Sequence, residues 1–188
     1  LAPYVYELNK PSGKKAETLN KFLLAHKIDN ICILNNYSIF PLIIREVVLE
    51  KNGERYQGMI VSNLDIVRNG TWAIHAMANQ ATLESIIEKV GSSYVRNSIN
   101  VLFINPPSVS LSKGHANLNT IVGSYELGVR FLEEALQAKN IIFSGRSLGA
   151  GIIGEVARRH KCLPRCKYLT VRIVPFNRLS DQAMEMFS

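Results

Sequence analysis

The sequence predicts an α/β fold: a mostly parallel sheet with helices on both faces and an N-terminal antiparallel hairpin. Two runs, 99–104 and 140–143, are apolar at consecutive positions, which is typical of strands buried on both faces. An amphipathic segment at 120–138 separates them and predicts a crossover helix. The hairpin is predicted by two strand-like runs that flank the Asn-Gly turn at 52–53.

Length and composition fit a single globular domain. A chain of 188 residues can bury roughly 70% of its unfolded surface. Hydrophobic residues at 47% and charged residues at 20% exclude a disordered chain. No apolar run approaches the roughly 18 residues of a membrane span. The formal net charge of +7 suits a nucleic acid or an anionic membrane surface as well as it aids solubility, so it selects no partner.

The chain divides at residue 40. Residues 1–40 are expected to form a helical covering segment, because Leu19, Phe22 and Leu23 recur at helical spacing within 14–27. Residues 41–188 are expected to form the α/β core. Its predicted elements are strands at 44–49, 56–61 and 71–76, a helix at 81–90, a strand at 99–104, a helix at 120–138, a strand at 140–143, a helix at 148–160, a strand at 168–174 and a helix from 179.

The three cysteines predict neither a disulfide framework nor a metal site. Cys32 lies in the apolar run 31–34 and is expected to be a buried thiol. His160, Cys162 and Cys166 lack a fourth ligand and a paired spacing elsewhere, so a metal site is not expected there.

The most informative stretch is Gly145-Arg146-Ser147-Leu148-Gly149, which has the G-x-S-x-G pattern. It stands directly after an apolar strand and before a helix, as the pattern requires. At such a turn the serine is held in a strained conformation above the sheet, and small residues are needed two before and two after it because strand and helix pass close together. Ser147 is therefore the predicted nucleophile, and the backbone N–H of Leu148 is the predicted oxyanion donor.

This turn and most of residues 44–188 resemble the α/β-hydrolase family. In that family the loop after the strand that follows the hairpin supplies a second oxyanion N–H; the strand here is 72–75, and Asn79 is the expected donor. The resemblance implies hydrolysis of an ester, including a lipid ester, through an acyl-enzyme on Ser147, without a metal or organic cofactor.

A narrower resemblance is to the chlamydial CHLPS group and to lipase-like Legionella effectors. It implies a secreted effector of an intracellular bacterium that acts in the host cell. Ala78, Ser108 and Ser110 stand where the wider family has glycines, which alters the backbone expected near the oxyanion hole. The segments behind the narrower resemblance are Trp72, Ala78-Asn79, Asn105-Pro106-Pro107, the 145–149 turn and Phe176-Asn177-Arg178-Leu179-Ser180.

The acid and the histidine of the family's triad have no counterpart in the sequence. They follow the nucleophile in the family, whereas a single predicted strand follows Ser147 here, so the fold is expected to be incomplete at the C-terminus. Every histidine is a poor candidate for the base: His75 is expected to pack in the core, His115 to lie in an exposed loop, and His26 and His160 are badly placed. Asp181 is expected to stabilise the start of a helix.

Two alternatives stay open. Ser144, Gly145, Gly149 and Gly151 resemble the phosphate turn of NAD(P)-binding short-chain dehydrogenases, but that turn opens its fold and needs an acidic residue further on, where this chain has basic ones. The other alternative is a non-catalytic hydrolase-like module that binds an anionic membrane surface or a protein partner. Few aromatic residues interleave with its basic side chains, so nucleic acid is not expected. Those side chains are Arg158, Arg159, Lys161, Arg165, Lys167, Arg172 and Arg178, against three acids between 155 and 185.

Overall fold

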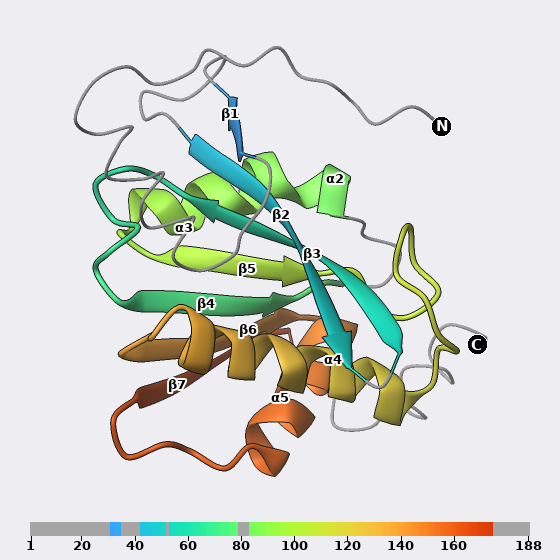
Figure 1. Cartoon of the computed structure of the whole chain (residues 1–188). Coiled ribbons are helices and arrows are strands. Elements are labelled where there is room, and N and C mark those ends of the chain that lie inside the picture. Colours follow the sequence, from blue (N-terminus) through green and yellow to red (C-terminus); the bar gives the residue numbers. More distant parts are fainter. Residues whose placement is uncertain (1–30, 35–41, 52, 79–82, 175–188) are drawn as a thin grey trace.

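The computed structural model describes residues 31–34, 42–51, 53–78 and 83–174. Within them lies one seven-stranded sheet in the order β1-β2-β3-β5-β4-β6-β7 (Figure 1). The strands are β1 (Ile31–Leu34), β2 (Leu42–Lys51), β3 (Glu54–Ser62), β4 (Thr71–Ala76), β5 (Asn100–Ile104), β6 (Asn140–Arg146) and β7 (Lys167–Ile173). β1, β2, β3 and β5 pair antiparallel, and β5, β4, β6 and β7 pair parallel. The predicted fold class is confirmed.

The hairpin of β2 and β3 closes at the predicted turn. Its last register pair is Lys51 with Glu54. Gly53 has φ 79°, a left-handed conformation that glycine adopts without steric cost. The Asn-Gly signal was therefore sufficient to locate the turn.

Helices cover both faces of the sheet (Figure 1). One face carries α2 (Leu83–Ile86), the π-helical η1 (Ile87–Gly91) and α3 (Ser92–Arg96), which follow one another directly. Their buried side chains pack with Ala73, Val101 and Phe103 of the central strands. The other face carries α4 (Leu118–Arg130), the π-helical η2 (Phe131–Ala135) and α5 (Leu148–Arg159), whose apolar side chains meet Trp72, Ile74 and Leu102.

Helix α4 begins two residues earlier than predicted because of a capping box. The side chain of Asn117 accepts a hydrogen bond from the Thr120 amide at 3.0 Å, and the Thr120 hydroxyl accepts one from the Asn117 amide at 3.0 Å. The helical run ends at Ala135 rather than at 138, because Gln137 takes φ 51°.

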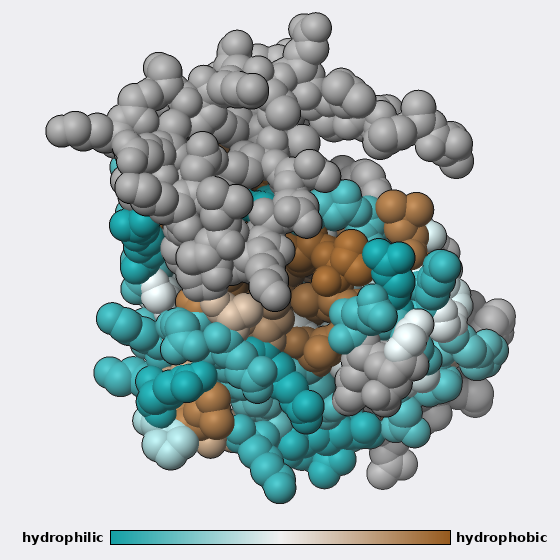
Figure 2. Space-filling model, in the orientation of Figure 1, coloured by the Kyte–Doolittle hydropathy of each residue, from teal (hydrophilic) through white to brown (hydrophobic). Residues whose placement is uncertain are grey.

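The sheet starts ahead of residue 41, because Ile31–Leu34 adds the edge strand β1. The helices expected at 14–27 and from 179 lie outside the described residues, as does the rest of the 1–40 covering segment. None of the described helices is long and apolar enough to cross a membrane. In the view of Figure 2 the described surface is mostly hydrophilic around one hollowed apolar area.

Candidate active site

Ser147 lies between the last residue of β6 and the first residue of α5, and its backbone is strained. Its φ of 53° and ψ of −121° fall outside the regions favoured by L-residues, and such a conformation costs of order 1–3 kcal/mol. Backbone bonds hold it on both sides: the Ser147 N–H donates to the Ile173 carbonyl at 3.0 Å, and the Ser147 carbonyl accepts from Ala150 at 2.9 Å and from Gly151 at 3.4 Å. The residue is half-buried, so it is neither in a regular element nor enclosed in the core.

Only glycine fits at positions 145 and 149, because backbone atoms occupy the space that a Cβ would need. A Cβ on Gly145 would lie 2.3 Å from the Gly149 carbonyl oxygen. A Cβ on Gly149 would lie 2.1 Å from the carbonyl oxygen of Ala76 and 2.5 Å from that of Met77. Backbone atoms of three segments, the ends of β4 and β6 and the start of α5, therefore meet at this point. This contact explains why the pattern needs a small residue on either side of Ser147.

The turn lies at a topological switch point of the sheet. β4 and β6 are parallel neighbours, yet the helices that follow them leave on opposite faces (Figure 1). Ligands of open α/β sheets bind in the crevice outside the carboxyl ends of two such strands. β4 ends at Ala76, opposite Gly145. Asn79 follows three residues later and lies outside the described residues, so its role as oxyanion donor stays a prediction.

Helix α5 directs its N-terminal end at Ser147. The first amides of a helix lack acceptors within it, and the aligned peptide dipoles place partial positive charge there. Leu148 is the first residue of α5, and it is half-buried. The role of its amide as an oxyanion donor stays a prediction.

A buried polar cluster lies one register pair before the turn, and sequence analysis missed it. Tyr94 of α3 donates from its hydroxyl to Ser144 Oγ at 2.5 Å. His75 Nδ1 lies 3.0 Å from the same hydroxyl and 3.3 Å from Ser144 Oγ. Burial lowers the pKa of His75 to about 4, so its ring is neutral at pH 7. His75 also packs edge-on against Phe103, which confirms its expected place in the core.

His160 belongs to a second polar cluster at the amino end of β6 and β7. Its Nε2 lies 2.8 Å from Glu133 Oε1, and Tyr168 donates its hydroxyl to the same oxygen at 2.5 Å. Burial and the hydrogen bond to Glu133 raise the pKa of Tyr168. Because Tyr168 pairs with Ile141, six residues before Ser147, the cluster lies roughly 20 Å from the turn along the strand. His160 and Glu133 therefore do not serve Ser147.

The other candidate ligands and bases are also dispersed. Cys166 is buried and donates to the Ala138 carbonyl at 3.0 Å, whereas Cys162 is exposed. In the part of the chain that the structure describes, no group of His, Cys, Asp and Glu side chains could hold a metal ion. His115 is exposed in the loop before α4, as expected. His26 and Asp181 lie outside the described residues.

The basic side chains between 158 and 172 are all exposed. Several of these basic side chains nevertheless form hydrogen bonds within the protein. Arg158 and Arg159 both bond Glu155, at 2.6 Å in each closest contact, and lower its pKa to about 2. Arg172 donates to the Ala150 carbonyl at 3.1 Å, on the first turn of α5.

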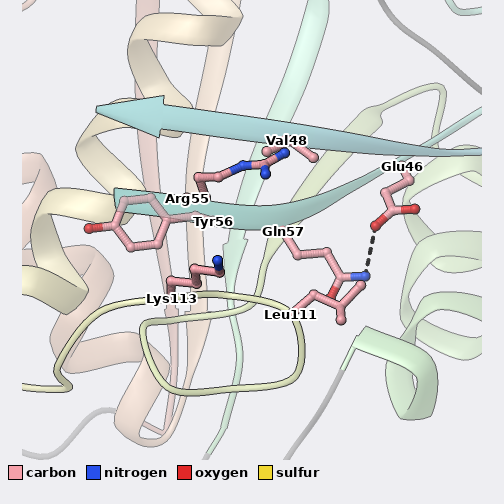
Figure 3. Close-up of a pocket in the computed structure, with 7 residues that line it drawn as sticks. All are labelled: Glu46, Val48, Arg55, Tyr56, Gln57, Leu111 and Lys113. Carbon is pink, nitrogen blue, oxygen red and sulfur yellow. Dashed lines mark hydrogen bonds between the residues drawn. The ribbon is translucent and has the colours of Figure 1, made fainter. Parts of the chain in front are cut away.

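A separate pocket of about 250 Å³ lies between the β2–β3 hairpin and the loop after β5 (Figure 3). Charged side chains of both signs line it, Glu46, Arg55 and Lys113, together with the exposed apolar Val48 and Leu111. Gln57 donates to Glu46 at 2.9 Å across one side of it. β5 and β4 separate its strands from β6, so this pocket does not lie at the Ser147 turn.

Comparisons with known proteins agree with this geometry. A family model described as Chlamydia CHLPS protein (DUF818) matches residues 58–164, more than half of the chain. No curated protein matches the sequence. An esterase from Pyrococcus furiosus is 16% identical, with a TM-score of 0.61 over 86% of this chain and 62% of that one. An α/β serine hydrolase homologue from Coxiella burnetii is 16% identical, with a TM-score of 0.56 over 81% of this chain and 86% of that one.

Coverage differs among the solved structures. Est1E from Butyrivibrio proteoclasticus, solved with ferulic acid bound, is 14% identical with a TM-score of 0.51, over 59% of this chain and 46% of that one. In two other structures of the Pyrococcus furiosus esterase, this chain covers 46% and 48% of the esterase chain, which is about half of its length. At these identities the similarity shows the fold. The chain belongs to the Chlamydia CHLPS protein family and has the α/β-hydrolase fold.

Proposed function

We propose that the protein is a serine ester hydrolase in which Ser147 is the nucleophile. The observation that carries this proposal is the backbone of Ser147, held at φ 53° and ψ −121° by contacts that only glycines at 145 and 149 allow. Strained residues of this kind persist only where the surrounding structure over-determines them, and they cluster at active sites.

In the proposed reaction the Ser147 hydroxyl attacks the ester carbonyl and the alcohol leaves, which gives an acyl-enzyme that water then hydrolyses. The amides of Leu148 and Asn79 stabilise the developing oxyanion. A base must take the hydroxyl proton, and the structure gives His75 and His160 other partners. The proposed reaction therefore uses a base other than His75 and His160, and it needs no metal or cofactor.

Labelling with a fluorophosphonate probe tests the proposal. Trypsin cuts after Arg146, so Ser144 falls on the peptide 140–146 and Ser147 begins the next one. Mass spectrometry therefore assigns the adduct without ambiguity. We expect the adduct on Ser147, its loss in Ser147→Ala, and its retention in Ser144→Ala, a matched change three residues away in a side chain that is 2% exposed. Labelling that persists in Ser147→Ala, or none in the wild type, contradicts the proposal.

The finer predictions extend this proposal. A lipid ester as substrate, and the likeness to Legionella lipase-like effectors acting in a host cell, follow from the sequence resemblance. Turnover of p-nitrophenyl esters with acyl chains of two to sixteen carbons, by the wild type and by Ser147→Ala, separates lipid esters from short-chain esters as substrates. A Ser147-dependent rate that rises with acyl length supports the lipid ester, and a rate confined to the shortest esters contradicts it.

A non-catalytic hydrolase-fold module is the second candidate function. Two observations favour it. His75 contacts Tyr94 and His160 contacts Glu133, and the basic residues between 158 and 172 are exposed. Sedimentation with vesicles containing phosphatidylserine, compared with phosphatidylcholine alone, tests it at two salt concentrations. Binding that needs the anionic lipid and falls with salt supports the module; equal binding to both vesicles counts against it.

A further inference from the structure

We infer that Tyr125 is a positioning residue for the segment after β4, and through it for the Ser147 turn; the second part of this inference rests on the proposed function. Tyr125 lies in α4 and is 1% exposed. Its hydroxyl donates to the carbonyl of Ile104, the last residue of β5, at 3.2 Å. It also accepts a hydrogen bond from the Met77 amide, just beyond the end of β4.

The hydroxyl sits where two central strands part. The register of β4 and β5 ends at the pair His75 and Phe103, whereas β4 stays paired with β6 as far as Ala76 and Gly145. Beyond His75, the Ile104 carbonyl and the Met77 amide are joined through Tyr125 instead of through the ladder. The phenol therefore bridges the carboxyl ends of β4 and β5, next to the pair Ala76 and Gly145.

Met77 is held from two sides. Its amide bonds Tyr125, while its carbonyl oxygen would lie 2.5 Å from a Cβ on Gly149. The Met77 N–H and the Ala76 carbonyl belong to one planar, rigid peptide group, and the Ala76 oxygen would lie 2.1 Å from a Cβ on Gly149. A shift at the amide is therefore passed to the atoms packed against Gly149, two residues after the nucleophile.

The depth of the phenol is fixed by the packing of α4. Gly128 follows Tyr125 by one turn, and a Cβ there would lie 2.4 Å from Ile104 Cδ1 and 2.8 Å from Ile74 Cδ1. The missing side chain lets the helix approach β4 and β5 closely, which carries the Tyr125 hydroxyl down to the backbone. Replacement by phenylalanine removes one oxygen and leaves this packing in place.

Two measurements on the full chain test the inference in Tyr125→Phe. The first is hydrogen exchange of the Met77 amide, which we expect to be about ten- to a hundredfold faster because a buried hydrogen bond is lost. The second is the rate of fluorophosphonate labelling at Ser147, which we expect to fall about tenfold through misplacement of the neighbouring segment. Tyr56→Phe is the matched control, because the Tyr56 hydroxyl donates to the Glu54 side chain within the β2–β3 hairpin, away from Met77 and Ser147.

A destabilised control separates positioning from stability. Val129→Ala shortens a fully buried side chain of the same helix without removing the hydroxyl, so it should lower the unfolding temperature and leave both readouts unchanged. Unchanged exchange at Met77 in Tyr125→Phe overturns the inference whether or not the protein labels. Faster exchange with an unchanged labelling rate overturns the link to Ser147. If the wild type does not label, the proposed function fails, and the exchange result alone decides whether Tyr125 holds Met77.

Discussion

Substitution of Gly149 by alanine should strongly destabilise the protein. The new methyl carbon would lie 2.1 Å from the Ala76 carbonyl oxygen and 2.5 Å from that of Met77. Both obstacles are backbone atoms of a central strand and its end, so no side-chain rotation relieves the overlap. Overpacking in a core costs about 1–3 kcal/mol when side chains can adjust, and here β4 or α5 must move. We therefore expect a loss of about 3 kcal/mol or more in the free energy of unfolding.

Gly123→Ala is the matched control for this prediction. Gly123 lies in α4, and a Cβ on it would meet nothing within 4 Å. Alanine is favoured over glycine in a helix by about 1 kcal/mol, so this change should stabilise the protein by up to that amount. Urea unfolding followed by far-UV circular dichroism measures both variants. A Gly149→Ala variant within about 0.5 kcal/mol of the wild type would refute the close contact of β4, β6 and α5.

Three further predictions concern stability. Burial lowers the pKa of His75 to about 4, so as pH falls the unfolded chain takes up the His75 proton before the folded protein does. The contribution of neutral His75 to the free energy of unfolding is therefore complete above pH 6.5 and is lost between pH 6.5 and 4. The loss amounts to about 2 kcal/mol by pH 5. Urea unfolding should show that loss in the wild type and not in His75→Gln. Asn117→Ala should cost about 1 kcal/mol by removing the cap of α4, and an unchanged midpoint would argue against the cap. Tyr168→Phe should cost about 1–3 kcal/mol while the labelling rate of Ser147 stays at the wild-type value; slower labelling would show that the Glu133 cluster reaches the turn.

Local patterns located most of the fold. The hairpin follows from the Asn-Gly turn, and the Ser147 turn follows from two glycines between an apolar strand and a helix; each signal lies within a few consecutive residues. The end of the helical run formed by α4 and η2 was predicted wrongly, because the local signal that usually marks such an end is missing. Gln137 takes a left-handed φ of 51° without the glycine that usually marks such a helix end, so the periodic apolar residues were extended to 138.

The polar clusters could not be predicted, because their members are distant in sequence. Tyr94 and Ser144 are 50 positions apart, and Tyr125 bonds Ile104 across 21 positions. Each of these residues also fits the apolar face of a helix or a strand, so its hydroxyl carries no signal until the strand order is known. Once β4 is placed between β5 and β6, Ser144 must face His75, and α4 must cross the ends of β4 and β5.

The strained backbone of Ser147 is held in part by β7, which lies at one side of the described sheet. The Ser147 amide bonds the Ile173 carbonyl, the last residue of β7, and Arg146 pairs with the same residue. β7 is the outermost described strand on that side, and Leu169, Val171 and Ile173 are between 38% and 58% exposed. An edge strand frays more readily than a central one. If the end of β7 separates, the bond from the Ser147 N–H to Ile173 is lost, and the serine can relax by the roughly 1–3 kcal/mol that such strain typically stores. The backbone conformation of Ser147 is therefore coupled to how firmly the end of β7 is held in the sheet.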